Sequence, residues 1–323
     1  MDIRRLIDKL EQNGELLRIT TKVDTRFELC EITDRISKQA GGGKAILFEN
    51  TGTGYPVLMN MMGSDRRMAW ALDVEDLDEI SARIDDLLKD ALSPKHSLWE
   101  KMQMLPLLGD VAKWFPKRIK GRGRCQEVVW QGDEVDLSKL PILTSWPADG
   151  GPFITLPMVA TVDPESGIPN LGMYRMQILD KRTTGMHWHR HKTGARHYDA
   201  YKRLGRRMPV SVAIGGDATY IYSATAPLPD NLDEMLLAGM LRRRPVRLVK
   251  SLTNDIWVPE DCDFVIEGYV DPTEDLTVEG PFGDHTGFYS LTDLYPKFHV
   301  ECITSRRDAI YAATIVGVPP MED

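Results

Sequence analysis

The first part of the chain carries apolar positions that recur with the period of an α-helix. Residues 3–10 follow the i, i+3, i+4, i+7 rule, and Gly14 supplies a stop signal, so they predict a short amphipathic helix. Residues 16–23 predict a strand, and residues 60–72 and 77–88 predict two further helices. We expect these elements to form a small α/β layer.

A second helix is predicted between Thr25 and a run of three glycines. Thr25 with Glu28 predicts a capping box, and Gly41–Gly43 end the helix. Three glycines could also form a phosphate loop, but such a loop needs a strand before it and a helix after it. Here a helix precedes the glycines and the β-like residues 45–48 follow, so we interpret the glycines as a helix terminator.

The pattern changes between residues 93 and 123, where prolines interrupt it and a basic run occupies residues 117–124. We interpret the basic run as a solvated linker, with the grip of an anionic ligand as the alternative. A domain boundary near residue 120 follows, with domains over 1–120 and 121–323.

Beyond that boundary, β-branched stretches separated by Gly and Pro turns predict an antiparallel sheet or barrel. The predicted strands are 127–130, 158–162, 172–179, 210–214, 246–250, 264–269, 298–303 and 309–315. One helix, over 232–241, is apolar on most faces and should be buried, with Asp230 or Asn231 as its N-cap.

Composition and charge narrow the class of protein. The 323 residues are 42% hydrophobic and 27% charged, which is typical of a folded globular chain. With 40 Lys and Arg against 48 Asp and Glu, the net charge of −8 argues against binding to a nucleic-acid backbone.

Cysteine spacing and the N-terminal residues predict a cytoplasmic protein. Cysteines 30, 125, 262 and 302 contain no CxxC pair, which favours neither a zinc knuckle nor a disulfide framework. The first residues lack the apolar core of a secretory signal, and no apolar run reaches the ~20 residues of a membrane helix.

Four of the seven histidines lie between residues 187 and 197. In an extended segment His187, His189 and His191 would lie on one face, within reach of a common metal or anion. The alternative is an exposed polar face at a barrel mouth, beside Trp188.

The segment GIPNLGMYR, residues 167–175, places polar groups on a predicted strand. Asn170 offers an amide oxygen at the start of the strand, and Arg175 follows five residues on. An Arg inside an apolar strand is costly unless it faces a carboxylate or an anionic ligand. Arg175 therefore predicts an acidic partner, with a surface position on an edge strand as the alternative.

The segment EGPFGDHTG, residues 279–287, predicts a rigid loop that carries two carboxylates, Glu279 and Asp284, beside His285. Two neighbouring carboxylates raise one another's pKa, so one of them could hold a proton near neutral pH and act as a general acid. A structural tight turn is the alternative.

Together these segments resemble the UbiD family of decarboxylases, which includes 3-polyprenyl-4-hydroxybenzoate and ferulic acid decarboxylases. The resemblance covers essentially the whole chain and rests on NLGMYRMQ, MHWHRHKTGARHY, DEMLLAGMLR, EGPFGDHTGFY and DAIYAATIVGVPPMED. It implies an α+β fold, with a small N-terminal α/β domain followed by an antiparallel split β-barrel that binds flavin. It also implies reversible, non-oxidative decarboxylation of aromatic or α,β-unsaturated acids with prenylated FMN, Mn²⁺ (or Mg²⁺) and K⁺.

The resemblance also implies roles for individual residues. The implied metal ligands are Asn170, His191 and Glu234, and the implied catalytic trio is Arg175, Glu279 and Asp284 with Asp284 as proton donor. The implied flavin-lining residues are Met173, Tyr174, Arg175, His187, Trp188, His189, Lys192 and Thr193. Some relatives have Glu at the position of Asp284, and the polyprenyl-hydroxybenzoate branch shares Asp, which favours a 4-hydroxybenzoate-type substrate in quinone or aromatic-acid metabolism.

The implied partners are a small aromatic acid, a flavin prenyltransferase that supplies the cofactor, and further copies in a homo-oligomer. Family members continue past the GVPPMED stretch into a third domain, which this sequence, ending at Asp323, does not contain. Two alternatives stay open: a zinc hydrolase built on His187, His189 and His191, and a flavin-binding module without turnover.

Overall fold

A computed structural model describes residues 1–83, 113–228 and 232–323. The helices are α1 (Ile3–Gln12), α2 (Glu28–Ser37), α3 (Asp65–Leu72), α7 (Thr193–Leu204), α8 (Ala218–Thr225) and α9 (Glu234–Leu241). The first nine strands are β1 (Leu16–Ile19), β2 (Ala45–Phe48), β3 (Val57–Met59), β4 (Lys117–Arg118), β5 (Val128–Gln131), β6 (Phe153–Ile154), β7 (Met158–Val162), β8 (Pro169–Met173) and β9 (Met176–Ile178). The others are β10 (Thr183–Met186), β11 (Met208–Ile214), β12 (Arg247–Lys250), β13 (Trp257–Pro259), β14 (Phe264–Val270), β15 (Thr277–Glu279), β16 (Asp293–Tyr295), β17 (Lys297–Ser305) and β18 (Tyr311–Ala312).

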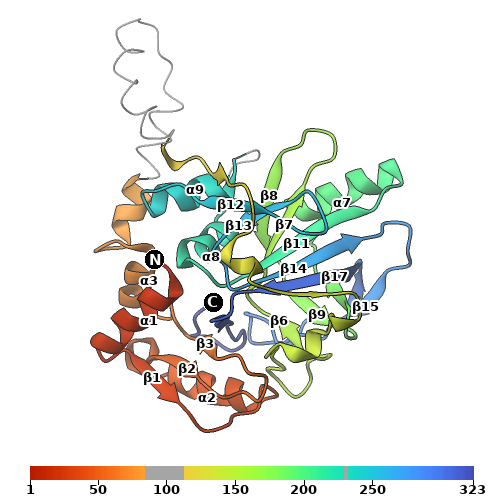
Figure 1. Ribbon diagram of the computed structural model, residues 1–323. Helices are drawn as coiled ribbons and strands as arrows, with labels where there is room; N and C mark the ends of the chain where they lie inside the picture. Colours follow the sequence, from red (N-terminus) through yellow and green to blue (C-terminus); the bar gives the residue numbers. More distant parts are fainter. Residues whose placement is uncertain (84–112, 229–231) are drawn as a thin grey trace, which may run out of the picture.

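The N-terminal region is a small α/β layer, as predicted. Its sheet has the order β1-β2-β3-β18, so the last strand of the described chain pairs in parallel with β3. Figure 1 shows the consequence: the C-terminal residues lie between the N-terminal region and the large sheet. The division at residue 120 stays a prediction.

The second half of the chain forms a curled, antiparallel half-barrel, which confirms the predicted fold class. Within the described residues its sheet runs β6-β9-β10-β17-β14-β11-β7-β8, with β5 paired to β17. The predicted strand over 172–179 is interrupted at Tyr174 and Arg175, between β8 and β9. The predicted strand over 309–315 is shorter than expected, because only Tyr311 and Ala312 pair with β3.

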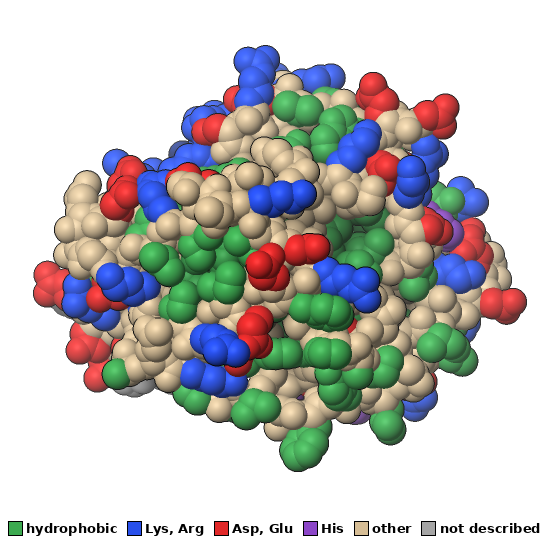
Figure 2. All heavy atoms as spheres, turned by 90° about the horizontal axis from the view of Figure 1, so that it is seen from below, with side chains coloured by type: hydrophobic (Ala, Val, Ile, Leu, Met, Phe, Trp, Pro, Cys, Tyr) green, Lys and Arg blue, Asp and Glu red, His purple; other side chains and the backbone are tan. Residues whose placement is uncertain are grey.

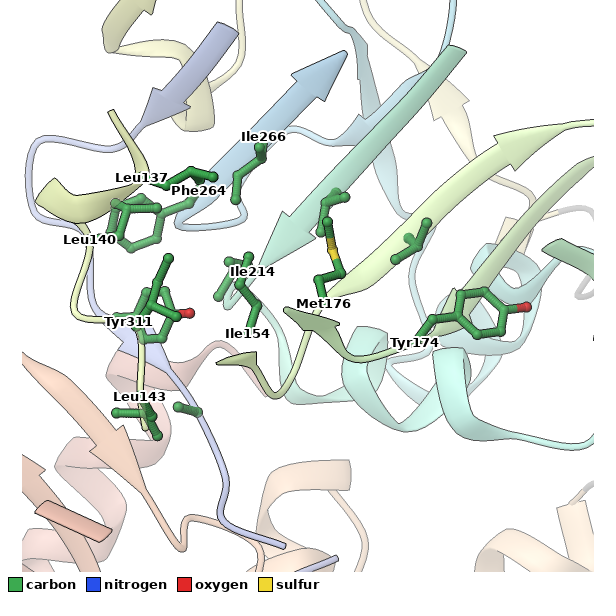
Figure 3. Close-up of a cluster of buried hydrophobic side chains, with 14 of the residues drawn as sticks. Leu137, Leu140, Leu143, Ile154, Tyr174, Met176, Ile214, Phe264, Ile266 and Tyr311 are labelled. Atoms are coloured by element: carbon green, nitrogen blue, oxygen red, sulfur yellow. The ribbon is translucent and has the colours of Figure 1, made fainter. Parts of the chain in front are cut away.

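A continuous apolar core fills the half-barrel and reaches into the N-terminal region. Phe264 and Ile266 of β14, Ile214 of β11 and Tyr311 of β18 are all fully or almost fully buried in it. Figure 3 shows these side chains together with Leu137 and neighbouring residues from other parts of the chain. The core therefore joins segments that are far apart in sequence and fixes where the polar segments lie.

Helix α9 is buried as predicted, but its cap differs. The side chain of Asp233 accepts a hydrogen bond from the Met235 amide at 2.8 Å, so Asp233 is the N-cap. The prediction of Asp230 or Asn231 is wrong, because the helix begins at Glu234, later than its apolar run.

Three expectations for the first 124 residues need correction. Thr25 does not cap α2, because Glu28 accepts instead from the Asp24 amide at 2.8 Å. The helix expected over 60–72 starts only at Asp65, since Ser64 is its N-cap. Part of the basic run forms strand β4 beside β12 rather than a solvated linker. The texture change at 93–112 and the end of the helix expected over 77–88 lie outside the described residues.

The surface agrees with a modest net negative charge. Figure 2 shows one face, on which acidic and basic side chains are interspersed and hydrophobic side chains lie in patches between them. None of the described helices is both long and apolar enough to cross a bilayer.

The three glycines form a tight turn after α2, because their carbonyls contact a second loop. Gly42 has φ +80°, and a Cβ atom built on it would lie 1.8 Å from the carbonyl oxygen of Gly63. The buried guanidinium of Arg67 donates to the carbonyls of Gly42 and Gly43. The turn is thus a packing device, consistent with its interpretation as a terminator rather than a phosphate loop.

Gly42→Ala is expected to destabilise the chain by about 2 kcal/mol, because the left-handed φ and the clash with Gly63 both oppose a Cβ atom. Urea unfolding measures this loss. Gly41→Ala is the matched control: it has a similar φ of +70° but nothing within 4 Å of its built Cβ. Equal losses for both variants would contradict the packing argument.

Candidate functional site

Arg175, Glu279 and Asp284 meet at one end of the half-barrel. Arg175 donates to both carboxylate oxygens of Glu279, with Nε–Oε1 at 2.9 Å and Nη2–Oε2 at 3.1 Å. Its Nη1 lies 3.9 Å from Oδ2 of Asp284. The acidic partner predicted for Arg175 is therefore present, and the alternative of a surface position is wrong, since its side chain is only 11% exposed.

The interruption between β8 and β9 explains why Arg175 can reach Glu279. The backbone leaves the sheet at Tyr174 and Arg175 and rejoins it at Met176. Gln177 then anchors the other segment, because its side-chain oxygen accepts from the Gly280 amide at 2.7 Å. The break turns an apolar strand into a platform for one charged side chain.

The loop between β15 and β16 is held to the half-barrel at several points. Asp149 accepts from the Gly283 amide at 2.8 Å, and Ser290 accepts from the Phe282 amide at 3.1 Å. Ser290 also accepts from Arg175 at 3.2 Å. These contacts hold the backbone beside Asp284, so the segment is more than a connecting turn.

The charge of Arg175 controls both carboxyls. Burial raises the pKa of Asp284, but hydrogen bonds from His285 and the charge of Arg175 outweigh it, so its pKa lies below the usual range. Burial also raises the pKa of Glu279, and hydrogen bonds from His187 and Arg175 lower it further than burial raises it. The expectation that one carboxyl keeps a proton near neutral pH is therefore wrong here, because a guanidinium lies beside both.

His187 and His189 extend this network. His187 Nδ1 lies 3.0 Å from Oε2 of Glu279, and its Nε2 lies 3.1 Å from Nε2 of His189. The ring of His187 packs on Tyr295 with centroids 4.3 Å apart. The histidine pair thus joins the buried Glu279 to the more exposed His189.

A cavity of about 500 Å³ opens beside Arg175 and Asp284. Six of the predicted flavin-lining residues line it: Met173, Tyr174, Arg175, His187, His189 and Lys192. Trp188 instead is buried in the core beside Tyr174, with ring centroids 6.5 Å apart. A cavity with apolar walls and a few convergent polar groups fits a flat aromatic ring system.

Asn170 and Glu234 line a second, neighbouring cavity of about 350 Å³, together with Thr193. Glu234 accepts from the Leu171 amide at 2.9 Å, and burial raises the pKa of Glu234 to about 7. The Asn170 amide nitrogen is buried without a hydrogen-bond partner among the described residues. An unpaired amide beside a buried carboxylate fits a hard divalent cation, whose ligands are oxygens.

His191 does not join this pair. It lines a third cavity, with His189, Tyr198 and Tyr295 among its neighbours, and its side chain is exposed. The described residues contain no group of three or more His, Cys, Asp or Glu that could hold a metal. The predicted common site of His187, His189 and His191 is therefore not formed, because the chain turns into α7 directly after His191.

Several residues of the main cavity were not predicted from the sequence. They are Met62, Met68, Thr155, Leu156, Ile221, Tyr222, Thr225, Phe282, His285, Thr314, Val316, Glu322 and Asp323. Most belong to segments with no polar motif, so no signal could have found them. Only the GVPPMED stretch, which contributes Val316 and Glu322, carried a recognisable pattern.

Comparison with known families gives two matches along the chain. Residues 7–84 match the N-terminal domain of 3-octaprenyl-4-hydroxybenzoate carboxy-lyase, called UbiD_N. Residues 117–319 match the Rift-related domain of the same carboxy-lyase, called UbiD.

Individual relatives are similar over the whole chain. An uncharacterized protein of Aquifex aeolicus is 50% identical over 100% of this chain and 66% of its own length. Vanillic acid decarboxylase of Sedimentibacter hydroxybenzoicus in its closed form is 26% identical, with a TM-score of 0.85 over 99% of this chain and 65% of its own. An evolved dimeric form of the UbiD-class enzyme HmfF from Pelotomaculum thermopropionicum, in complex with prFMN, is 27% identical, with a TM-score of 0.82 over 98% of this chain and 67% of its own. The chain spans about two thirds of the length of these relatives.

Proposed function

Since the chain belongs to the UbiD family of 3-octaprenyl-4-hydroxybenzoate carboxy-lyases, we propose that it decarboxylates an aromatic or α,β-unsaturated acid, without net oxidation, using prenylated FMN. The observation that carries the proposal is the contact of Arg175 with Glu279 and Asp284 at the wall of a largely apolar cavity. A 4-hydroxybenzoate-type acid is the proposed substrate. The vanillic acid decarboxylase that shares the fold supports this class, since it acts on a hydroxylated aromatic acid.

Loss of CO₂ from an sp² carbon leaves an electron pair that no side chain can delocalise. The flavin, when bound, supplies the electron sink. The residues of this chain then have two tasks: to hold the acid with its carboxylate beside the ring system, and to return a proton to the carbon that lost CO₂.

Arg175 is proposed to hold the carboxylate of the substrate, and Asp284 to donate the proton. A substrate carboxylate beside Arg175 would offset the positive charge that now keeps the pKa of Asp284 low. Asp284 would therefore take up a proton when the cavity is filled. Glu279 holds Arg175 in place through its two hydrogen bonds.

Asn170 and Glu234 are the proposed ligands of Mn²⁺ or Mg²⁺, which would tie the phosphate of the flavin to the protein. Thr193 lines the same cavity, while Lys192 lines the neighbouring one, so the nucleotide tail could run between them. His191 is proposed as the third ligand and would have to turn from its present cavity. K⁺ is proposed as a second ion by resemblance alone.

The direct test is expression of the full chain together with a flavin prenyltransferase. We expect mass spectrometry to detect prenylated FMN in the purified protein, and CO₂ release from at least one hydroxylated aromatic acid in a panel. Bound cofactor without CO₂ release, and without carboxylate-dependent H/D exchange, would identify a flavin-binding module instead.

Glu234→Ala is expected to weaken Mn²⁺ binding at least ~10-fold and to reduce flavin retention, because the cavity then lacks its buried carboxylate. Elemental analysis and flavin absorbance after gel filtration measure both. Glu165→Ala is the matched control, since Glu165 lines the same cavity but is exposed and paired with Arg203 at 3.2 Å. Unchanged metal and flavin content in Glu234→Ala would remove Glu234 from the ligand set.

A further inference from the structure

Glu322 is a carboxylate at the main cavity that has no role in the proposed chemistry. Its Oε1 accepts from the backbone amide of Met62 at 2.7 Å, and its Oε2 accepts from the hydroxyl of Thr314 at 3.0 Å. Burial raises the pKa of Glu322, and these hydrogen bonds work in the opposite direction. The side chain therefore joins the C-terminal residues to a loop of the N-terminal region.

That loop is itself held rigidly. Asn60 lies in the left-handed region with φ 55°, and its side-chain amide donates to the carbonyls of Gly42 and Lys44 at 2.8 and 2.9 Å. Gly63 fits only because it lacks a side chain, since a Cβ there would lie 1.9 Å from Oδ1 of Asn60. The three glycines, which the proposed function leaves unexplained, thus support one side of the loop, and Glu322 supports the other.

The loop matters because it carries a wall of the cavity. Met62 and Met68 bring the N-terminal region into the cavity that also contains Arg175 and Asp284. Met62 is half-buried, and its own amide is the donor to Glu322. A movement of this amide would change the space opposite the two charged residues.

We propose that Glu322 is a positioning residue that holds Met62 as a wall of the acid-binding cavity, so that Met62 selects the substrate by the size of its ring. The inference rests on the proposed function, because that function identifies the cavity as the acid site. Glu322 acts through the Met62 amide and makes no contact with the reacting atoms.

The test uses the full chain loaded with FMN and carrying Met62→Cys. All four native cysteines are buried, and burial raises the pKa of Cys30 and of Cys302 to about 12, so the new thiol is the one that a maleimide reaches. We expect 4-hydroxybenzoate to slow labelling at least ~5-fold, because a ring in the cavity covers the thiol.

Glu322→Ala, added to Met62→Cys, should abolish this protection. Glu322→Gln should retain it, because the amide oxygen can still accept from Met62 and the amide nitrogen can donate to Thr314 Oγ1. Glu301→Ala is the matched control for removal of a carboxylate, since Glu301 is exposed on β17. Circular dichroism confirms that each variant is folded, and Glu322→Gln keeps the test valid if Glu322→Ala does not fold.

In the enzyme loaded with prenylated FMN, Met62→Ala and Glu322→Ala should each raise KM for 4-hydroxybenzoate about 10-fold, with kcat within about 3-fold of the parent. The proposal is overturned if 4-hydroxybenzoate protects the thiol equally with and without Glu322. It is also overturned if the acid is decarboxylated by the parent but never protects the thiol. Protection of the thiol without CO₂ release from any acid would instead refute the proposed function and leave this inference standing.

Discussion

Asp284→Asn is expected to lower kcat about 10³-fold while leaving the flavin bound. The amide keeps the size of the side chain but cannot deliver a proton, and general acid catalysis contributes about 10²- to 10⁴-fold. Asp284 lines the cavity beside Arg175 without a role in the proposed metal site, so cofactor content should not change. CO₂ release and flavin absorbance, measured on the same preparation, separate the two effects.

The matched control is Asp293→Asn on strand β16. Asp293 belongs to the same hairpin and is exposed, so its loss tests whether any change of charge on the hairpin slows turnover. We expect turnover within about 2-fold of the parent for this variant. Undiminished turnover in Asp284→Asn would remove Asp284 from the role of proton donor.

Arg175→Met is expected to abolish decarboxylation and to destabilise the fold by about 3 kcal/mol at neutral pH. The substitution removes both hydrogen bonds to Glu279 and leaves a fully buried carboxylate without its strongest partner. Breaking a buried ion pair by removing one member is costly because the other charge stays buried. Urea unfolding measures the loss.

The pH dependence of this loss identifies its cause. In the parent protein the pKa of Glu279 is lowered, so its contribution to stability is present above the usual value of 4.5 and is lost as pH falls. In Arg175→Met burial dominates and raises that pKa. Glu279 is then protonated in the folded state at a pH where the unfolded state has already ionised, so stability falls as pH rises.

The difference in unfolding free energy between parent and Arg175→Met should therefore grow between pH 4 and pH 8. Arg182→Met serves as the control, because Arg182 is an exposed arginine whose carboxylate partner, Asp133, is also exposed. A difference that stays constant with pH would show that the loss comes from packing rather than from the charge of Glu279.

The sequence predicted the type of most elements but not where they begin and end. Periodicity identified α1 and β7 closely, because their apolar positions face one core. It missed the break at Tyr174 and Arg175, because the residues on either side are apolar and resemble one strand. It also placed the cap of α9 before Asp233, because apolar residues precede the helix itself.

The candidate site divides in the same way. The carboxylates of one loop and an arginine in an apolar strand were visible as chemical anomalies, and the structure brings them together. The spacing of His187, His189 and His191 suggested a common face, but that argument assumed an extended backbone. The chain turns into α7 after His191, so the third histidine points elsewhere.

What the sequence alone determined is the family, the fold class and the charged residues that carry the proposed chemistry, because these depend on residue types at short separations. Only the tertiary structure decided which distant groups meet. The lowered pKa of Asp284, the pairing of Asn170 with Glu234 and the hold of Glu322 on Met62 all depend on contacts between remote segments. Such contacts are set by the packing of the shared core, which pulls β18 and the C-terminal residues against the N-terminal region, and no local pattern encodes that approach.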